Sequence, residues 1–80
     1  MVDLHRDDAV GKQIAELAVL AGACSSKSQA TRLARGGGLY WNNAPVADGK
    51  WVPGSDQFIG GGTIGVLRTG KTNYFIVRLV

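Results

Sequence analysis

The sequence predicts an α+β fold, in which two packed helices are followed by a small, mostly antiparallel sheet. Apolar residues recur at helical spacing as far as residue 35, and a glycine triplet at residues 36–38 ends that pattern. The residues after it form short strand-prone runs separated by turn signals. With 80 residues, 45% of them hydrophobic, the chain is expected to form one domain with a modest core.

The polar residues 1–8 are expected to form a flexible segment that precedes a domain at residues 9–80. A first helix is predicted over residues 9–21, because apolar side chains recur there with a helical period, and Gly22 ends it. This helix is expected to pack on the second one, with Leu33 as a contact. Its apolar positions are Val10, Ile14, Leu17, Ala18 and Ala21.

A second helix is predicted to begin after Ser26 and to end at Arg35. Ser26 and Gln29 have the spacing of a capping box, in which each side chain satisfies the backbone N–H of the other residue. The glycine triplet at residues 36–38 then ends the helix, because glycine adopts the left-handed cap conformation at little cost.

The second helix is predicted to be amphipathic. At about 100° per residue, Ala30, Leu33 and Ala34 fall on one side of the helix. Cations on one short helix repel one another, so the opposite side favours a polyanionic partner such as nucleic acid. A solvated face that only keeps the protein soluble is the alternative. That basic side carries Lys27, Arg32 and Arg35, flanked by Ser28 and Thr31.

A strand is predicted at residues 39–42, with Leu39 and Trp41 facing the core and Tyr40 facing outward. Residues 42–43 form a turn signal, and residues 44–46 begin a return strand whose proline suits a sheet edge. The carboxy-terminal part is predicted to be a hairpin, with arms at residues 63–68 and 73–79. Further cations lie in this half of the chain, at Lys50, Arg68 and Lys71.

Residues 65–72 match the phosphate-loop pattern G-x-x-x-x-G-K-T, but their context argues against nucleotide hydrolysis. A phosphate loop opens a helix whose positive end faces the anion, whereas the residues after Thr72 form a strand pattern. Gly70 and Lys71 are better explained as a hairpin turn that presents a cation. No catalytic residue is expected in this chain.

Cys24 is the only cysteine and His5 the only histidine, so a dedicated metal site is not expected. Cys24 is interpreted as a small apolar side chain packed between the helices, and a reducing compartment fits a single thiol. The formal net charge is +3, and the basic residues gather after residue 16. The sequence contains no run of 18 apolar residues and no visible signal peptide, so a membrane partner is not expected.

Part of the chain follows the pattern S-x-x-E-A-R-R-L-x-x-x-G-G-V-x-V-N-G and thus resembles the RNA-binding domain named after ribosomal protein S-four. Gln29, Thr31 and Asn43 depart from the pattern, and Thr31 removes one cation. The matching residues are Ser26, Ala30, Arg32, Leu33, Gly37, Gly38 and Asn42.

The terminal hairpin resembles the last strands of tyrosyl-tRNA synthetases, which read L-R-x-G-K-K-x-Y-x-(L/V)-V. Thr72 replaces the second lysine. Together the two resemblances cover about residues 17–80. The amino-acid sequence of this segment is most similar to that of the mitochondrial enzymes of filamentous fungi. The matching hairpin residues are Leu67, Arg68, Gly70, Lys71, Tyr74 and Val77.

This resemblance implies an S-four-like, αL-type fold that serves as a non-catalytic RNA-binding appendix of a tyrosine–tRNA ligase. It implies tyrosine tRNA as the partner, structured group I intron RNA as a second ligand in splicing, and a homodimeric parent enzyme. ATP would then be a cofactor of the parent's catalytic domain only, and the mitochondrial matrix or otherwise the cytoplasm would be the compartment. The candidate RNA-binding residues are Lys27, Ser28, Thr31, Arg32, Arg35, Lys50, Arg68 and Lys71.

Two other classes of function stay open on the sequence alone. One is an RNA-binding domain of another protein with the same helix motif, such as a ribosomal protein or a pseudouridine synthase. The other is a protein-interaction module whose exposed strand edge recruits a partner.

Overall fold

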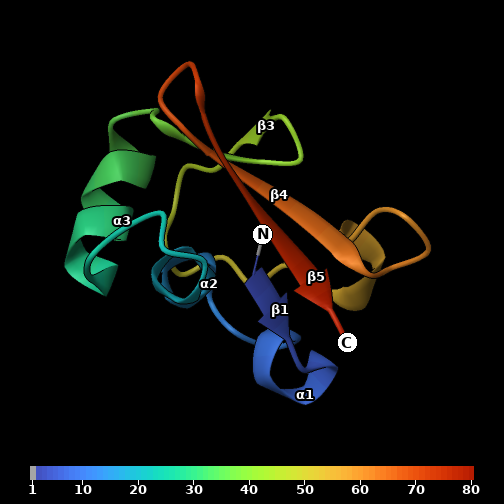
Figure 1. The fold of residues 1–80 in the computed structure, drawn as a ribbon. Helices are drawn as coiled ribbons and strands as arrows, with labels where there is room; N and C mark the ends of the chain where they lie inside the picture. The colour runs from blue at the N-terminus through green and yellow to red at the C-terminus, as the bar shows by residue number, and fades with distance from the viewer. Residues whose placement is uncertain (1) are drawn as a thin grey trace.

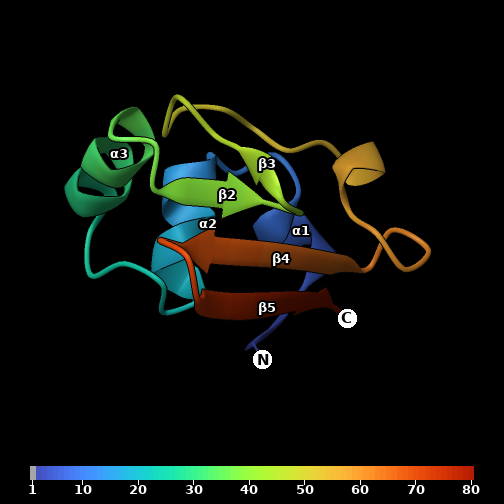
Figure 2. The same cartoon turned by 90° about the horizontal axis from the view of Figure 1, so that it is seen from above.

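The computed structural model describes residues 2–80 and confirms the α+β class. Among these residues the helices are α1 (Arg6–Ala9), α2 (Ile14–Leu20) and α3 (Lys27–Arg35), with one 3₁₀ turn at Ser55–Gln57. Figure 1 shows the helices on one side of a twisted sheet. Figure 2 shows the sheet in front, with α1 and α2 behind it and α3 at its side. The architecture is compatible with an S-four-like fold.

The described residues form one five-stranded sheet, in the order β1-β5-β4-β2-β3. Neighbouring strands are antiparallel except β1 and β5, which confirms the prediction of a mostly antiparallel sheet. The bounds are β1 (Val2–Leu4), β2 (Leu39–Trp41), β3 (Ala44–Pro45), β4 (Ile64–Thr69) and β5 (Asn73–Leu79).

Residues 2–8 differ from the expectation of a flexible segment at residues 1–8, of which Met1 lies outside the described residues. Val2–Leu4 form a strand that pairs in parallel with β5, with Val2 opposite Val77. Asp3 points outward and pairs with Arg78. This segment therefore contributes a strand to the sheet and also includes most of α1. The pairing joins opposite ends of the sequence, so no pattern of neighbouring residues predicts it.

The predicted helix over residues 9–21 is wrong at its start, because the chain forms two separate helices there. Gly11 adopts a φ of +91°, which interrupts helical backbone before α2 begins at Ile14. The backbone N–H of Ile14 donates to the carbonyl of Trp51 at 2.7 Å, and that of Ala15 donates to Gly49 at 3.0 Å. A distant loop thus satisfies N–H groups that have no partner within the new helix.

α3 has the predicted bounds, and its amino-terminal cap differs from a capping box in one contact. The Ser26 hydroxyl accepts from the backbone N–H of Gln29 at 3.1 Å, as predicted. The Gln29 side chain, however, accepts from the N–H and hydroxyl of Ser25, at 2.6 and 2.9 Å, and not from Ser26. Gly37, at a φ of +79°, ends the helix.

The core lies between the helices and the inner face of the sheet. Leu17 is fully buried, as predicted, whereas Leu33 is only partly buried at the edge of the core. The side chain of Leu33 lies over Gly38, where a Cβ would collide with it. Ala30 and Ala34 instead supply the buried contacts of α3. The other large buried side chains include Ile14, Leu39, Trp41, Leu67 and Val77.

The turns and strands after α3 follow the predicted pattern closely. Leu39 and Trp41 are buried while Tyr40 is partly exposed, and Pro45 lies on the edge strand β3. Asn42 and Asn43 both have positive φ, which is typical of a type I′ hairpin turn. In the terminal hairpin the first arm is displaced by one residue, because Thr69 still pairs with Asn73.

The structure also places the residues of the phosphate-loop pattern in a hairpin. Gly65 to Thr69 lie in β4, residues 70–72 form the turn, and β5 follows where a phosphate loop would open a helix. Gly65 is buried against the Trp41 ring, so a phosphate could not approach its backbone. Within residues 2–80 no helix has the length and apolar character needed to cross a membrane.

Candidate nucleic-acid interface

α3 presents the predicted basic face to solvent. Lys27, Arg32 and Arg35 are exposed, and Ser28 is exposed beside them. Thr31 is only half-buried, and its side chain packs against the backbone of Gly49, where a Cβ would not fit. Thr31 therefore joins α3 to the loop that also supports the start of α2.

The three cations of α3 differ in how far they are neutralised. Lys27 Nζ lies 3.7 Å from a carboxylate oxygen of Glu16, which also attracts Lys12 at 3.9 Å. Among the ion pairs of residues 2–80, none involves Arg32 or Arg35. Exposed pairs of this kind contribute little to stability, but they lower the local positive potential. The strongest unpaired charge on α3 is therefore at its carboxy-terminal turn.

A groove of about 560 Å³ separates α3 from the tip of the β4–β5 hairpin. The hairpin is fixed beside the helix end, because the Gly70 N–H donates to the Gly38 carbonyl at 2.8 Å. Lys71 follows Gly70 in the exposed turn. The fold thus brings Arg32 and the turn that carries Lys71 to the two sides of one groove. Its lining residues are Ala23, Cys24, Gln29, Arg32, Leu33, Thr69, Gly70 and Asn73.

Arg68 is held in place and does not extend freely toward solvent. Its guanidinium carbon lies 3.8 Å from the centre of the Tyr40 ring, and Nη1 donates to the Gly70 carbonyl at 3.0 Å. Its Nε is buried and has no hydrogen-bond partner within the described chain. These contacts orient Arg68 on the outer sheet face, away from the helix groove.

Lys50 lies in the loop that touches both α2 and α3. Its backbone N–H donates to Asp48 Oδ1 at 2.9 Å, and its side chain is exposed. Sequence reasoning grouped Lys50 with the other cations, whereas the structure shows a carboxylate in the same turn. The eight predicted site residues thus divide among α3, the Lys50 loop and the β4–β5 hairpin.

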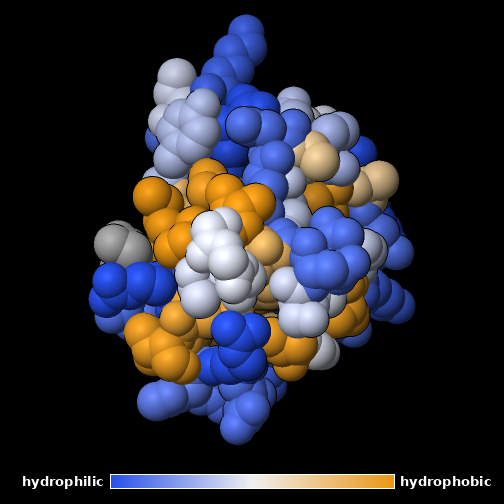
Figure 3. Space-filling view, turned by 90° about the vertical axis from the view of Figure 1, so that its right-hand side faces the viewer, coloured by the Kyte–Doolittle hydropathy of each residue, from blue (hydrophilic) through white to orange (hydrophobic). Residues whose placement is uncertain are grey.

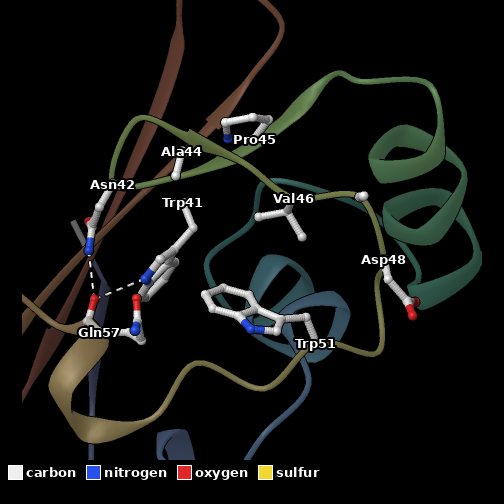
Figure 4. A pocket seen from close by; sticks show the side chains of 9 residues that line it. Trp41, Asn42, Ala44, Pro45, Val46, Asp48, Trp51 and Gln57 are labelled. Atoms are coloured by element: carbon white, nitrogen blue, oxygen red, sulfur yellow. Dashed lines mark hydrogen bonds between the residues drawn. The ribbon is translucent and has the colours of Figure 1, made fainter.

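A second hollow, of about 410 Å³, lies beside the sheet edge at β3. The indole rings of Trp41 and Trp51 point into it, below Val46 (Figure 4). Trp41 Nε1 donates to the Gln57 carbonyl at 2.9 Å, which fixes the inner wall. The Asp48 carboxylate at its rim repels phosphate, so this hollow does not belong to the basic surface.

Cys24 is buried between the helices, and burial raises the pKa of its thiol, which disfavours the nucleophilic thiolate. Its interpretation as a packing residue is confirmed by this burial. Within the described chain, no group of three or more histidine, cysteine or acidic side chains is placed to hold a metal ion. Sequence reasoning missed Asn73 as a groove residue, although the inward phase of alternating residues in β5 would have shown it.

Comparison with known proteins gives no match to a family model, but it gives several similar proteins. The chain is 41% identical to a tyrosine–tRNA ligase of Roseiflexus castenholzii over 79 residues, which are 98% of the chain and 18% of that protein. The chloroplastic/mitochondrial tyrosine–tRNA ligase of Arabidopsis thaliana is 42% identical over 74 residues, covering 91% of the chain and 14% of the enzyme. The homologues of the present chain are therefore tyrosine–tRNA ligases.

The tyrosine–tRNA ligase of Opitutus terrae is a further relative, with 37% identity over 70 residues, 88% of the chain and 16% of that ligase. The chain therefore spans less than a fifth of the length of these tyrosine–tRNA ligases. Because the match to the Roseiflexus ligase covers 98% of the chain, the shared segment includes both α3 and the terminal hairpin.

Proposed function

We propose that this chain is the non-catalytic, tRNA-binding appendix of a tyrosine–tRNA ligase and that it holds tyrosine tRNA through phosphate contacts and RNA shape. The observation that carries the proposal is that Arg32, which lines the groove between α3 and the hairpin tip, and Arg35, at the end of the same helix, form no ion pair within residues 2–80. The similarity to tyrosine–tRNA ligases over a small share of their length supports a part without the catalytic centre.

The proposed chemistry is electrostatic positioning. Guanidinium and ammonium groups that approach RNA phosphates release condensed counterions, so affinity falls with salt. Such contacts fix the register of the RNA but carry little sequence information, and double-helical RNA is recognised largely by its shape. Amino-acid activation with ATP belongs, in this proposal, to another part of the parent enzyme.

Arg32 and Arg35 are the first candidates for phosphate contacts, and Lys71, in the exposed hairpin turn, is the next. Lys27 and Lys50 have carboxylates nearby, so we assign them weaker contacts at the margin. Ser28 lies on the same face as a hydrogen-bond donor. Thr31 and Arg68 instead hold the surrounding backbone and sheet face in position. Six of the eight candidate residues are thus proposed to contact RNA, and the other two, Thr31 and Arg68, are proposed to position the backbone and the sheet face around them.

The finer expectations from the resemblance stay within the proposal. One relative is named as a chloroplastic/mitochondrial enzyme and others are bacterial, so the compartment follows the parent enzyme, with the mitochondrial matrix as one case. A homodimeric parent and a fungal mitochondrial origin are likewise proposals. Group I intron RNA has no support in the relatives' names and serves best as a comparison RNA.

The test is a binding titration of the 80-residue chain against tyrosine tRNA, a second tRNA with a long variable arm, and group I intron RNA. Affinity for tyrosine tRNA is expected to fall steeply as salt rises. Arg32→Ala should lower the slope of log affinity against log salt by about one contact. The matched control is Arg6→Ala, which removes the same charge from α1.

Arg6→Ala is expected to leave the salt slope nearly unchanged, because the residue lies outside the proposed surface. Equal effects of the two substitutions would show that only net charge matters and would contradict an interface on α3. Absence of any RNA binding at low salt would favour the protein-interaction alternative.

A further inference from the structure

Within residues 2–80, no helix covers the outer face of the sheet, because α1 and α2 lie behind the sheet and α3 lies at its side (Figure 2). Residues alternate between faces along β5, so Phe75 and Val77 turn toward the core while Tyr74 and Ile76 turn outward. Tyr74 is 58% exposed and Ile76 is 38% exposed. This face is therefore available to a ligand, and its residues decide what kind of ligand fits.

Three side chains form a row across the outer face, one from each of three neighbouring strands. Tyr40 of β2 pairs in register with Arg68 of β4, and Arg68 pairs with Tyr74 of β5. Side chains directly opposite one another on one face stand about 5 Å apart. The Arg68 guanidinium already stacks on Tyr40, at 3.8 Å. Tyr74, on its other side, keeps a largely exposed ring.

The charges around this row favour a nucleic acid over a protein partner. β2, β4 and β5 contain no acidic residue, and Lys71 is only three positions before Tyr74 in the exposed turn. The acid on the neighbouring strand β1, Asp3, is already paired with Arg78. A different side of the molecule, shown in Figure 3, carries hydrophobic and hydrophilic residues side by side.

We propose that the outer face of the β4–β5 hairpin is a stacking platform for one unpaired nucleobase of the bound RNA. The base lies on the Tyr74 ring, beside the Arg68 guanidinium, and its phosphate reaches Lys71. Every base has a π face, so such a platform reads the presence of an unpaired base and not its identity. This inference rests on the proposed RNA-binding function and adds a second contact to it.

The hairpin separates the two contacts onto opposite sides. Thr69 and Asn73 line the groove toward α3, whereas Arg68 and Tyr74, their immediate neighbours in sequence, face the outer side. An RNA that uses both surfaces has to pass round the turn at Lys71. A regular double helix offers no free base there, so a bulge or loop is the feature that fits.

The test compares two RNA probes that differ in one nucleotide. One is a short RNA hairpin with a single unpaired 5-bromouridine in its stem, and the other is the same hairpin with that nucleotide deleted. The wild-type chain is expected to bind the bulged probe more tightly, and ultraviolet light should cross-link the unpaired base to the peptide that contains Tyr74. Tyr74→Leu should lose roughly five- to 150-fold in affinity for the bulged probe alone.

Tyr74→Phe is the matched control, because it keeps the ring, and it should retain both the preference and the cross-linked peptide. Arg32→Ala should weaken both probes equally, since it acts through the groove. Tyr74→Thr is a second variant without the ring, and threonine has a high strand propensity. If both ring-free variants lose the same affinity, the loss does not come from leucine disturbing the strand, and thermal melts show whether each variant is folded.

If the ring-free variants weaken neither probe, or weaken both equally, the stacking platform is wrong while RNA binding through α3 stands. Equal wild-type affinity for the two probes would also overturn the platform. If the wild-type chain binds neither probe at low salt, both the platform and the proposed function fail.

Discussion

Asn42 holds together three segments that are far apart in the sequence. Its side-chain oxygen accepts from the backbone N–H of Val66 at 2.8 Å, and its amide nitrogen donates to the Gln57 carbonyl at 2.7 Å. The same carbonyl accepts from Trp41 Nε1 (Figure 4). Asn42 also adopts a φ of +48° in the turn. One residue therefore fixes both the turn and the approach of the 3₁₀ segment to the sheet.

Removing the Asn42 side chain should be costly even when the backbone conformation is preserved. Asn42→Gly keeps a positive φ accessible, but it removes the acceptor of the Val66 N–H and leaves the Gln57 carbonyl with Trp41 Nε1 as its remaining donor. We therefore expect a loss of about 1–3 kcal/mol in the free energy of unfolding. The control is Asn43→Gly in the same turn, for which no side-chain hydrogen bond is recorded in the described chain. Urea unfolding curves measure both, and equal losses would show that only turn geometry matters.

Gly65 is required by a close contact with the Trp41 ring. A Cβ at this position would overlap the indole, which itself is buried and fixed by Phe58 at 5.1 Å between ring centres. We expect Gly65→Ala to cost about 1–3 kcal/mol through overpacking. Gly36→Ala is the matched control, because Gly36 has an ordinary helical φ of −79° and room for a methyl group. A neutral Gly65→Ala in thermal melts would mean that the Trp41 ring moves easily.

At the scale of elements, Leu17 of α2 and Leu33 of α3 differ in how deeply they are buried where the two helices pack. Leu17 is fully buried, so Leu17→Ala should cost about 2–5 kcal/mol of unfolding free energy. Leu33→Ala should cost clearly less, because Leu33 is half outside the core and borders the groove. Guanidinium unfolding of the two matched variants tests the order. The reverse order would place the main helix contact at Leu33.

The β1–β5 pair is closed by an ion pair that depends on pH. The bidentate hydrogen bond from Arg78, at 2.7 and 3.0 Å, lowers the pKa of Asp3 below its ordinary value of 3.8. A lowered carboxyl pKa adds stability above the ordinary value, and that stability is lost as pH falls through the lower, folded-state value. Wild type and Asp3→Asn should therefore differ in melting temperature near neutral pH and converge in acid.

The control for this pH effect is the same substitution in the absence of the partner. In an Arg78→Gln background, Asp3→Asn should leave the melting temperature almost unchanged at every pH. A persistent difference there would assign the effect to another partner of Asp3.

At the scale of the whole molecule, the features that the sequence predicted best are those that depend on residues close together in the chain. α3 follows from the Ser26 cap and the glycine stop, and the turn at residues 42–43 and the terminal hairpin follow from turn residues and alternation. The basic face of α3 was predictable because helical phase is local.

Features that depend on distant partners were not predictable in this way. β1 forms because β5 offers a partner at the other end of the chain, and α2 begins at Ile14 because the loop at residues 49–51 accepts its N–H groups. The row of Tyr40, Arg68 and Tyr74 depends on strand order and register, neither of which composition specifies.

The chain as a whole should not respond to ATP, despite its match to the phosphate-loop pattern. Gly65 is buried in β4 and Lys71 lies in a hairpin turn, so no ring of backbone N–H groups is arranged around an anion. Addition of Mg-ATP should leave the melting temperature unchanged, and no ATP should be turned over. A rise in melting temperature with ATP that disappears in Lys71→Ala would contradict this.

The parallel pairing of β1 with β5 also determines how the fold bears mechanical load. Tension applied at residues 2 and 80 would pull the two strands in opposite directions along their lengths, because both strands run the same way. The hydrogen bonds of the ladder and the Asp3–Arg78 pair would then be sheared together. In an antiparallel pair, the same pull would open the bonds one after another from one end. The first and last strands thus form a clamp against stretching, although β1 is only three residues long.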